Sequence, residues 1–322
     1  MSSNDPVEHF VTLFDSNYLP MGMALHDSLM AHGQPFHLWI VCMDRIVEEQ
    51  LGRLSLPHVT LIPLREVETR ELLDVKPGRT RGEYCWTLTP FTFGAVFDRD
   101  ASATRVTYLD SDLFFFSSPQ ILLRELDDAG KHVLITEHAY APEHKKWIRL
   151  SGRFCVQFLT FKRTAEAQKV MRWWQERCIE WCFSRAEEGK FGDQKYLDSW
   201  PELFAGEVHI VRQTEKTLAP WNVKYVAKKL HGRLDPVFYH FHSLALEGPD
   251  KVHLYRNYKI GKEGRRLYDV YLEALRRCLD TLNKFSIAIP YRPEAWHPAN
   301  IWQAIIFLLR KTRIMEYRTI NK

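Results

Sequence analysis

The sequence predicts an α/β protein with a central, mostly parallel sheet flanked by helices. Short apolar runs alternate with helical stretches along the chain, and the run Arg105–Phe116 is largely apolar apart from two acidic residues near its middle. Several other runs also end in acidic or polar side chains. Alternating strands and helices are typical of a right-handed wound sheet whose strands are buried on both faces. Because ligands bind outside the carboxyl ends of such strands, we expect a site at that edge.

The N-terminal elements follow a β-α-β-α-β order. Strands are expected at Phe10–Phe14, His37–Val41 and Val59–Pro63, with one helix ending at Gly33 and another covering Ile46–Leu54. Asp15 follows the first strand, where a ligand would bind. No Gly-x-Gly-x-x-Gly motif comes after that strand, which argues against a dinucleotide-dependent dehydrogenase.

A basic segment precedes the next helix. Residues 67–77 show no clear period, and Arg79–Glu83 is predicted to be a mobile loop before a helix at Tyr84–Phe97. The guanidinium groups of Arg79 and Arg81 are well suited to phosphate oxygens, since each can donate two parallel hydrogen bonds. A plain solvated loop is the alternative interpretation.

The second half of the chain continues the alternation of strands and helices. In a predicted helix over residues 164–185, Cys178 and Cys182 fall on an apolar stripe with helical spacing, which indicates core packing rather than a metal site. The remaining expected elements are helices at Ser117–Leu126 and Gly261–Lys284, and strands at His132–Thr136, Phe154–Phe161 and Val237–His242.

Asp110 and Asp112 are the main candidates for a metal site. They lie where the buried strand should end, and side chains two apart on an extended segment point the same way. Hard carboxylate oxygens suit Mg²⁺ or Mn²⁺, and such an ion is usually shared with substrate phosphates. The alternative is a solvated Asp-Ser-Asp turn before a helix.

Three further groups of residues are candidates for the site. Period two places His240 and His242 on one face of their predicted strand, and imidazole is a common ligand of divalent metals. Asp193 stands at a predicted helix start, either as a site residue or as an N-cap. The third group is the rigid aromatic loop that contains Trp221 and Asn222.

Composition indicates a soluble globular protein with reduced cysteines. The formal net charge of +4 is too small to imply a nucleic-acid partner, and the six cysteines include no Cys-x-x-Cys pair. The polar N-terminus resembles neither a signal peptide nor a transit peptide, so a cytoplasmic location is expected.

The C-terminal segment differs from the rest of the chain. Residues 301–322 contain five basic residues and one acidic residue, so they account for the whole charge excess. The apolar run at their start is shorter than the roughly 20 residues that a membrane span needs, but it matches a basic amphipathic helix lying on a membrane. Residues 299–322 are therefore a candidate for peripheral membrane contact. A helix packed on the domain or across a homodimer interface is the alternative.

Taken together, these motifs resemble those of GT-A nucleotide-sugar glycosyltransferases, and glycosyltransferase family 8 above all, over residues 8–245. The shared motifs are Asp15 and Tyr18 after the first strand, the Tyr-Leu-Asp-x-Asp sequence at Tyr108–Asp112, the pair Asp193-Gln194, the pair Trp221-Asn222, and His240 in a His-aromatic element. The resemblance implies a GT-A catalytic domain over residues 1–250 and a helical C-terminal extension over residues 251–322.

The resemblance also implies a role for each matching residue. Asp15 and Tyr18 would hold the nucleobase of the donor. The metal ligands would be Asp110, Asp112 and His240, with Mn²⁺ or Mg²⁺ as the cofactor. Asp193 and Gln194 would lie beside the transferred sugar as catalytic residues. Ser111, Trp221 and Asn222 would complete the donor site, together with Arg79 and Arg81, which are candidates for the phosphates by their own chemistry and not by the resemblance.

By this resemblance the protein is a metal-dependent hexosyltransferase. It would move a sugar from a nucleotide-diphosphate donor, a UDP-sugar, to a saccharide or lipid-linked saccharide in surface polysaccharide or lipopolysaccharide synthesis. Phe154–Gln157 replaces the family's Asn-Ala-Gly strand and no Lys-Pro-Trp follows His240, so the donor sugar and the retaining or inverting outcome stay open. Two other classes also stay open: a nucleotidyltransferase that makes nucleotide sugars, and a non-catalytic carbohydrate-binding protein.

Overall fold

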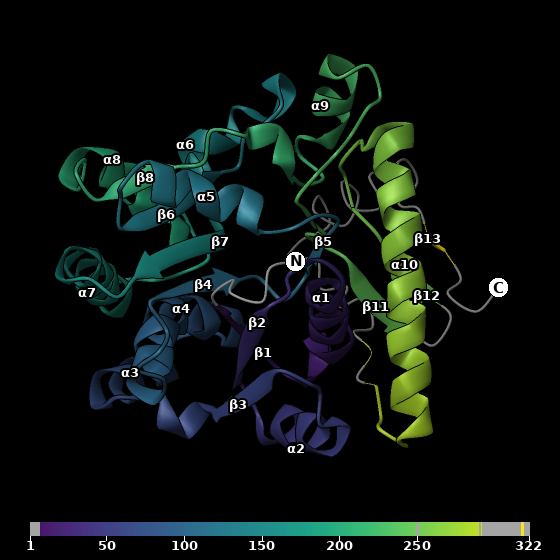
Figure 1. Cartoon of the computed structure of the whole chain (residues 1–322), viewed down its shortest axis with the longest axis horizontal. Coiled ribbons are helices and arrows are strands. Elements are labelled where there is room, and N and C mark those ends of the chain that lie inside the picture. Colours follow the sequence, from purple (N-terminus) through teal and green to yellow (C-terminus); the bar gives the residue numbers. More distant parts are fainter. Residues whose placement is uncertain (1–6, 249–250, 290, 292–316, 319–322) are drawn as a thin grey trace, which may run out of the picture.

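The protein is built around one seven-stranded sheet. The structure, a computed structural model, describes residues 7–248, 251–289, 291 and 317–318. The strand order is β3-β2-β1-β4-β7-β6-β8 (Figure 1). β7 runs antiparallel to both of its neighbours, and the other neighbouring pairs are parallel. The predicted fold class, an α/β protein with a mostly parallel sheet, is confirmed.

The strands of this sheet agree closely with the predicted runs. They are β1 (Glu8–Phe14), β2 (Phe36–Cys42), β3 (Val59–Pro63), β4 (Arg105–Leu109), β6 (Val133–Glu137), β7 (Phe154–Lys162) and β8 (Val208–Ile210). Two small three-stranded sheets lie beside it. One has the order β5-β10-β9, with β5 at Leu113–Phe115, β10 at Phe238–His240 and β9 at Thr217–Leu218; the other contains β11 (Ala245–Gly248), β12 (Lys251–His253) and β13 (Tyr317–Arg318).

Helices cover both faces of the main sheet. One apolar cluster joins the sheet to α1 (Leu19–His32), α2 (Arg45–Leu54), α5 (Gln120–Asp128), α9 (Val223–Lys229) and α10 (Gly261–Lys284). The other joins it to α3 (Arg70–Val75), α4 (Arg81–Arg99), α7 (Ala165–Glu180) and α8 (Trp200–Leu203). Successive residues of β1 alternate between the clusters, with Phe10 and Phe14 in the first and Val11 and Leu13 in the second. This alternation is what burial of a central strand on both faces requires.

The predicted mobile loop at Arg79–Glu83 is wrong. α4 begins at Arg81, and the side chains of Thr80 and Glu83 each accept a hydrogen bond from the backbone N–H of the other, as a capping box. The sequence Thr-x-x-Glu before an apolar stretch is typical of this cap. Residues 67–77, which have no clear period, contain α3, which lies between the 3-10 helices η2 (Leu64–Glu66) and η3 (Lys76–Gly78).

Two other predicted elements are shorter than expected. α7 ends at Glu180 instead of near residue 185, because Trp181 has an extended backbone. The strand predicted over residues 237–242 is reduced to β10. Gln194–Ser199 forms a 3-10 helix, η5, whose N-cap residue is Asp193.

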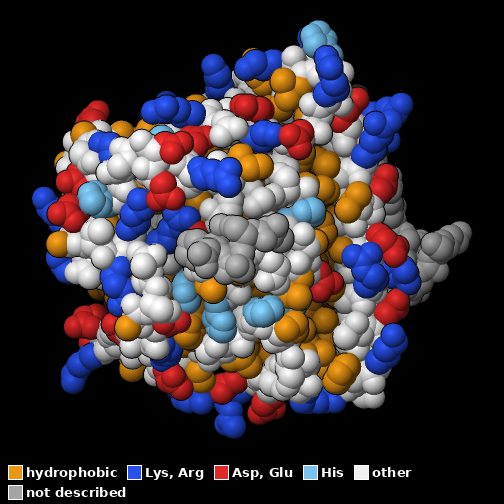
Figure 2. All heavy atoms as spheres, in the orientation of Figure 1, with side chains coloured by type: hydrophobic (Ala, Val, Ile, Leu, Met, Phe, Trp, Pro, Cys, Tyr) orange, Lys and Arg blue, Asp and Glu red, His pale blue; other side chains and the backbone are white. Residues whose placement is uncertain are grey.

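α10 runs along one edge of the molecule beside α1 (Figure 1). It packs into the same apolar cluster as α1 and β10, and the division of the chain at residue 250 stays a prediction. Apart from residues 317–318, the predicted amphipathic helix within residues 299–322 lies outside the described residues. No helix among the described residues is long and apolar enough to cross a membrane. On the face shown in Figure 2, basic and acidic side chains are interspersed.

Candidate active site

A cavity of about 740 Å³ lies at the edge of the main sheet where β1, β4 and β6 end. Each of these strands leads directly into a residue of the cavity wall: Asp15 after β1, Asp110 after β4 and His138 after β6. β7 runs the other way, so its first residues, including Cys155, reach the same edge. The volume is in the range of small-molecule sites, and the position is the one expected for a ligand of an open α/β sheet.

Asp110, Asp112 and His240 come together in this cavity. β10 pairs antiparallel with β5, and the register places His240 opposite Leu113, next to Asp112. The Nε2 atom of His240 is 3.1 Å from Oδ1 of Asp112 and 3.7 Å from Oδ2 of Asp110. The three side chains that the resemblance assigns to a metal ion are therefore neighbours, with the imidazole nitrogen facing both carboxylates.

Gln157 fixes the orientation of the His240 ring. Its Oε1 atom is 2.7 Å from Nδ1 of His240, and both side chains are buried. An amide oxygen can only accept, so Nδ1 donates and Nε2 faces the carboxylates, where it would bind an ion in place of its proton. The backbone of Gln157 also accepts a hydrogen bond from the N–H of Asp110, 3.0 Å long. Support of this kind behind a metal-binding histidine sets its tautomer and its direction.

Burial and mutual charge both shift the pKa values of the acidic and histidine side chains in this group. Burial opposes the charged forms, but the ion pair between Asp112 and His240 outweighs burial: it raises the pKa of His240 and lowers the pKa of Asp112. Burial, together with the charge of Asp112, raises the pKa of Asp110 to about 6, although His240 opposes that shift. Burial and the nearby charge of Asp110 raise the pKa of Asp193 to about 8. A cation placed between these carboxylates would relieve their mutual repulsion.

His242 lies in the same cavity, but its surroundings differ from those of His240. Burial, and then the charge of His240, lower the pKa of His242 to about 4. Its ring packs edge-on against Trp221, as does the ring of His240. Among the described residues no carboxylate lies within ion-pair distance of His242, so His240 is the better placed of the two histidines to bind an ion.

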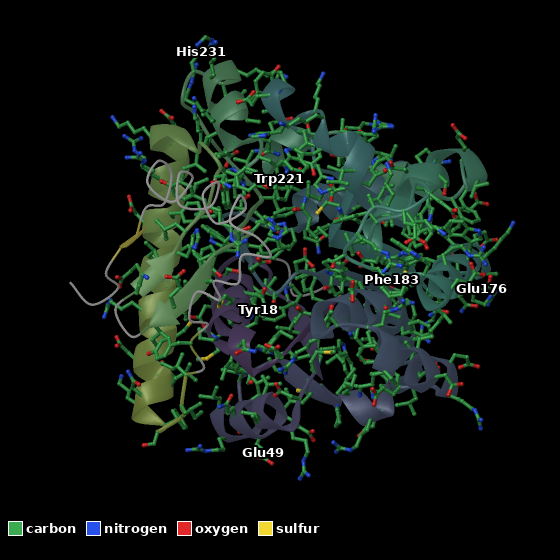
Figure 3. All side chains as sticks on the ribbon, turned by 180° about the vertical axis from the view of Figure 1, so that it is seen from behind. Tyr18, Glu49, Glu176, Phe183, Trp221 and His231 are labelled. Carbon is green, nitrogen blue, oxygen red and sulfur yellow. The ribbon has the colours of Figure 1, made fainter. Side chains whose placement is uncertain are left out.

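Asp15, Tyr18 and Arg81 also line the cavity. Tyr18 and Trp221, both labelled in Figure 3, reach the cavity from segments distant in sequence. The Nε atom of Arg81 donates to Asp15 over 2.8 Å, and its Nη2 atom donates to Asp44. Asp44 caps α2 and also accepts from the backbone of Ser16. Arg81 is therefore at the site but is held by two carboxylates, with about half of its side chain exposed.

Arg79 and Asn222 do not belong to the wall of this cavity. Arg79 donates to the backbone carbonyls of Cys178 and Ile179 at the end of α7. Its guanidinium lies 3.9 Å from the centre of the Phe183 ring. Phe183 is labelled in Figure 3. Asn222 is buried and holds its own loop: it accepts from the N–H of Ala219 and donates to the carbonyl of His138. Their contacts in the structure are those of residues that support the fold.

Asp193 and Gln194 both line the cavity. Asp193 is only 5% exposed and takes the N-cap position of η5, but its side chain makes no cap hydrogen bond, which argues against the alternative that it is only a cap. The indole N–H of Trp174 donates to its backbone carbonyl over 2.9 Å and so anchors this turn. The side chain of Gln194 donates to the carbonyl of Ser151 at the end of α6 (Trp147–Ser151), 2.6 Å away.

Two residues of the site have no counterpart in the prediction from sequence. Gln157 supports His240, and the thiol of Cys155 belongs to a group with Asp110 and His240 whose possible ligand atoms all lie within 4.8 Å of one another. Both residues come from β7, which the sequence indicates as one more apolar strand. Only the antiparallel direction of β7 brings its first residues to the carboxyl edge of its neighbours.

Comparison with other proteins gives two relatives by sequence. The chain is 33% identical to the uncharacterized protein YfnD of Bacillus subtilis over 284 residues, which cover 85% of this chain and 90% of YfnD. It is 34% identical to the uncharacterized protein YfnF of the same organism over 199 residues, which cover 61% of this chain and 66% of YfnF. No family model matches the sequence.

Two solved structures are similar in fold. The glycosyltransferase GlyE of Streptococcus pneumoniae, in its apo form, aligns with a TM-score of 0.50 and 14% identity over 88% of this chain and 65% of GlyE. The galactosyltransferase LgtC, in complex with donor and acceptor sugar analogues, aligns with a TM-score of 0.50 and 14% identity over 89% of this chain and 98% of LgtC. The protein thus has a GT-A-like fold, as the sequence motifs predict.

Proposed function

Since the chain belongs to the family of the uncharacterized protein YfnD of Bacillus subtilis and has a GT-A-like fold, we propose that it is a metal-dependent glycosyltransferase. Its donor would be a nucleotide-diphosphate sugar, with a UDP-sugar as the first candidate. The observation that carries the proposal is the convergence of Asp110, Asp112 and a His240 ring oriented by Gln157 at the carboxyl edge of the sheet. This edge is where such a fold binds its ligand.

The proposed donor site divides the cavity between the two parts of the nucleotide sugar. Asp15 and Tyr18 would bind the nucleobase, and Asp110, Asp112 and His240 would hold Mn²⁺ or Mg²⁺ against the diphosphate. A bound divalent ion would act as a Lewis acid and stabilise the negative charge of the leaving diphosphate. Arg81 and Ser111 line the same cavity and would position the phosphates.

Asp193 is the proposed catalytic carboxylate beside the transferred sugar. Its raised pKa means that the group is largely protonated at neutral pH in the free protein. Binding of a cation near Asp110 would lower that pKa, because Asp110 is one cause of the shift. Asp193 would then become available to remove the acceptor proton or to stabilise positive charge on the sugar ring. Gln194 would help to position the acceptor, since its side chain is hydrogen-bonded to the carbonyl of Ser151 in α6.

The acceptor is proposed to enter past α6, and its class is a saccharide or lipid-linked saccharide. Trp147 and Leu150 of α6 line the cavity while remaining more than a third exposed. An exposed indole at a cavity mouth can stack on a sugar ring or contact hydrocarbon. Lys146 and Arg149, also exposed, make no ion pair with the described residues and would attract an anionic acceptor. Membrane contact through residues 299–322, a homodimer and a cytoplasmic location stay proposals.

The proposal is tested by incubating the full chain with a panel of nucleotide sugars and either Mn²⁺ or Mg²⁺, with and without saccharide acceptors. We expect release of a nucleoside diphosphate from one donor, only with metal, and faster with an acceptor. The anomeric proton coupling of the product distinguishes retention from inversion. Exchange of pyrophosphate with a nucleoside triphosphate would instead indicate a nucleotidyltransferase, and saccharide binding without turnover would indicate a binding protein.

A further inference from the structure

Cys155 lies at the proposed metal centre, in a small apolar cluster with Ala219 and Trp221 that is separate from the two large ones. It is the second residue of β7, whose antiparallel direction brings it to the edge where β4 ends at Leu109. The side chain is 4% exposed and lines the cavity together with Asp110 and His240. The buried cysteines Cys42, Cys178, Cys182 and Cys278 instead belong to the two large apolar clusters on the faces of the sheet.

The geometry around Cys155 suits a shared ion. One possible ligand atom each from Asp110, Cys155 and His240 lie within 4.8 Å of one another. Ligands on a common divalent ion are about 3.5 Å apart, because metal–ligand bonds are about 2.0–2.3 Å long. A contraction of at most about 1.3 Å between any two of the three atoms would therefore bring them onto one ion. Asp112 does not belong to this group and contacts His240 separately.

The nature of the ligands indicates the class of ion. Mg²⁺ prefers an octahedral shell of oxygen atoms, whereas a set of carboxylate, imidazole and thiolate is typical of Zn²⁺ and of ions with similar preferences, such as Co²⁺. We propose that Cys155 is a metal ligand with Asp110 and His240, and that this centre binds Zn²⁺ or Co²⁺ more tightly than Mg²⁺. The inference rests on the proposed function in that it shares Asp110 and His240 with the proposed donor site.

Two ligand sets then overlap at one place. Asp110 and His240 are common to both, Asp112 completes an oxygen-rich set, and Cys155 completes a set that contains sulfur. An ion that favours oxygen would use the first, and an ion that accepts sulfur would use the second. The consequence is that the identity of the bound metal decides whether Cys155 is engaged.

The test is a titration of the full chain with Co²⁺ in the absence of a nucleotide-sugar donor. Absorbance and calorimetry monitor the binding. Wild type is expected to show a thiolate-to-cobalt charge-transfer band in the near ultraviolet, and Cys155→Ser to lose it. Affinity for Co²⁺ should fall by about 100-fold or more in Cys155→Ser, since even substitutions behind the ligands cost about 10–100-fold. Affinity for Mg²⁺ should change little. The matched control is Cys85→Ser, because Cys85 lines the same cavity outside the ligand group and should leave the band in place.

The outcomes separate this inference from the proposed function. A band that persists in Cys155→Ser, or wild type that binds Co²⁺ without a band, overturns the inference. Asp112→Asn should retain the band, whereas Asp110→Asn should lose it. If wild type turns over a nucleotide sugar with Mn²⁺ but shows no band with Co²⁺, only the inference fails. If the band depends on Cys155 but no nucleotide sugar reacts, only the proposed function fails.

Discussion

Asp193 is the residue whose chemistry is most strongly shaped by its surroundings. It is buried, it lacks a cap hydrogen bond, and it shares the cavity with Asp110 and Asp112. We expect Asp193→Asn to lower turnover by about 10²–10⁴-fold, the usual contribution of a positioned acid or base, with little change in UDP affinity. Initial rates and calorimetric UDP titration measure the two quantities. An equal loss of affinity and turnover would place Asp193 at the nucleotide.

The same substitution has an expected effect on stability that depends on pH. The pKa of Asp193 is about 8 in the folded protein, above its value in the unfolded chain. Between these two pH values the folded protein retains a proton that the unfolded chain has lost, so the stability of the wild type falls as pH rises. Asn cannot ionise, so Asp193→Asn should be more stable than wild type near neutral pH and above. The gain should grow between about pH 4, the pKa in the unfolded chain, and about pH 8, the pKa in the folded protein. Thermal melts across this range measure it. A gain that is independent of pH would mean that Asp193 is ionised in the free protein.

Gln157 provides a second test at the residue scale. Gln157→Leu removes the acceptor that orients His240, so Mn²⁺ affinity is expected to fall by about 10–100-fold. Gln157→Glu keeps an acceptor at that position and should restore most of the affinity. Calorimetric Mn²⁺ titration compares the variants. Equal affinity in wild type and Gln157→Leu would show that the hydrogen bond does not position the ligand.

At the scale of elements, the close approach of α1 to β1 holds in place the strand end that leads into Asp15, one of the residues proposed to bind the nucleobase. A Cβ atom at Gly22 would lie 2.4 Å from Cζ of Phe14, the residue before Asp15. Gly22→Ala is therefore expected to destabilise the protein by about 1–3 kcal/mol and to weaken UDP binding. Gly52→Ala is the matched control, since nothing lies within 4 Å of its added Cβ and the change should be neutral or stabilising by up to about 1 kcal/mol. Denaturant unfolding measures both.

The second test at this scale concerns α6. If α6 guides the acceptor, Trp147→Ala should raise the KM for the acceptor. Without an acceptor, the rate of metal-dependent donor hydrolysis should stay near that of wild type. Leu203→Ala in α8 is the control, because Leu203 is more exposed and lies outside the cavity wall. If Trp147→Ala instead lowers donor hydrolysis and leaves the acceptor KM unchanged, α6 acts on the donor.

How far the sequence predicts these elements depends on how local their signals are. The bounds of β3 and α10 agree with the prediction, because each is fixed by a run of apolar side chains with one period. The start of α4 also has a local signal in the sequence, the capping box at Thr80 and Glu83. The prediction of a loop there relied instead on the basic residues of the segment. The direction of β7 is set by its neighbours and not by its own residues, so the position of Cys155 could not be predicted.

At the scale of the whole molecule, the site is assembled from segments distant in sequence. Gln157 and His240 are 83 positions apart, and only the packing of β10 beside β5 and of β7 beside β4 brings them together. Of the residues predicted from the sequence for the site, all except Arg79 and Asn222 line the cavity, while their roles stay predictions. The sequence motifs do not predict which side chains support the ligands, because that depends on contacts between strands.

The central claim is that one ion, held by Asp110, Asp112 and His240, links the protein to the diphosphate of its donor. Calorimetric titration of UDP into the full chain, with Mn²⁺ or with EDTA, tests this most directly when wild type is compared with Asp110→Asn, Asp112→Asn and His240→Ala. UDP should bind wild type much more tightly with Mn²⁺, and this gain should be lost or strongly reduced in all three variants while their thermal melts remain cooperative. UDP affinity that is the same with Mn²⁺ and EDTA, or a gain from Mn²⁺ that survives in the variants, would contradict the account.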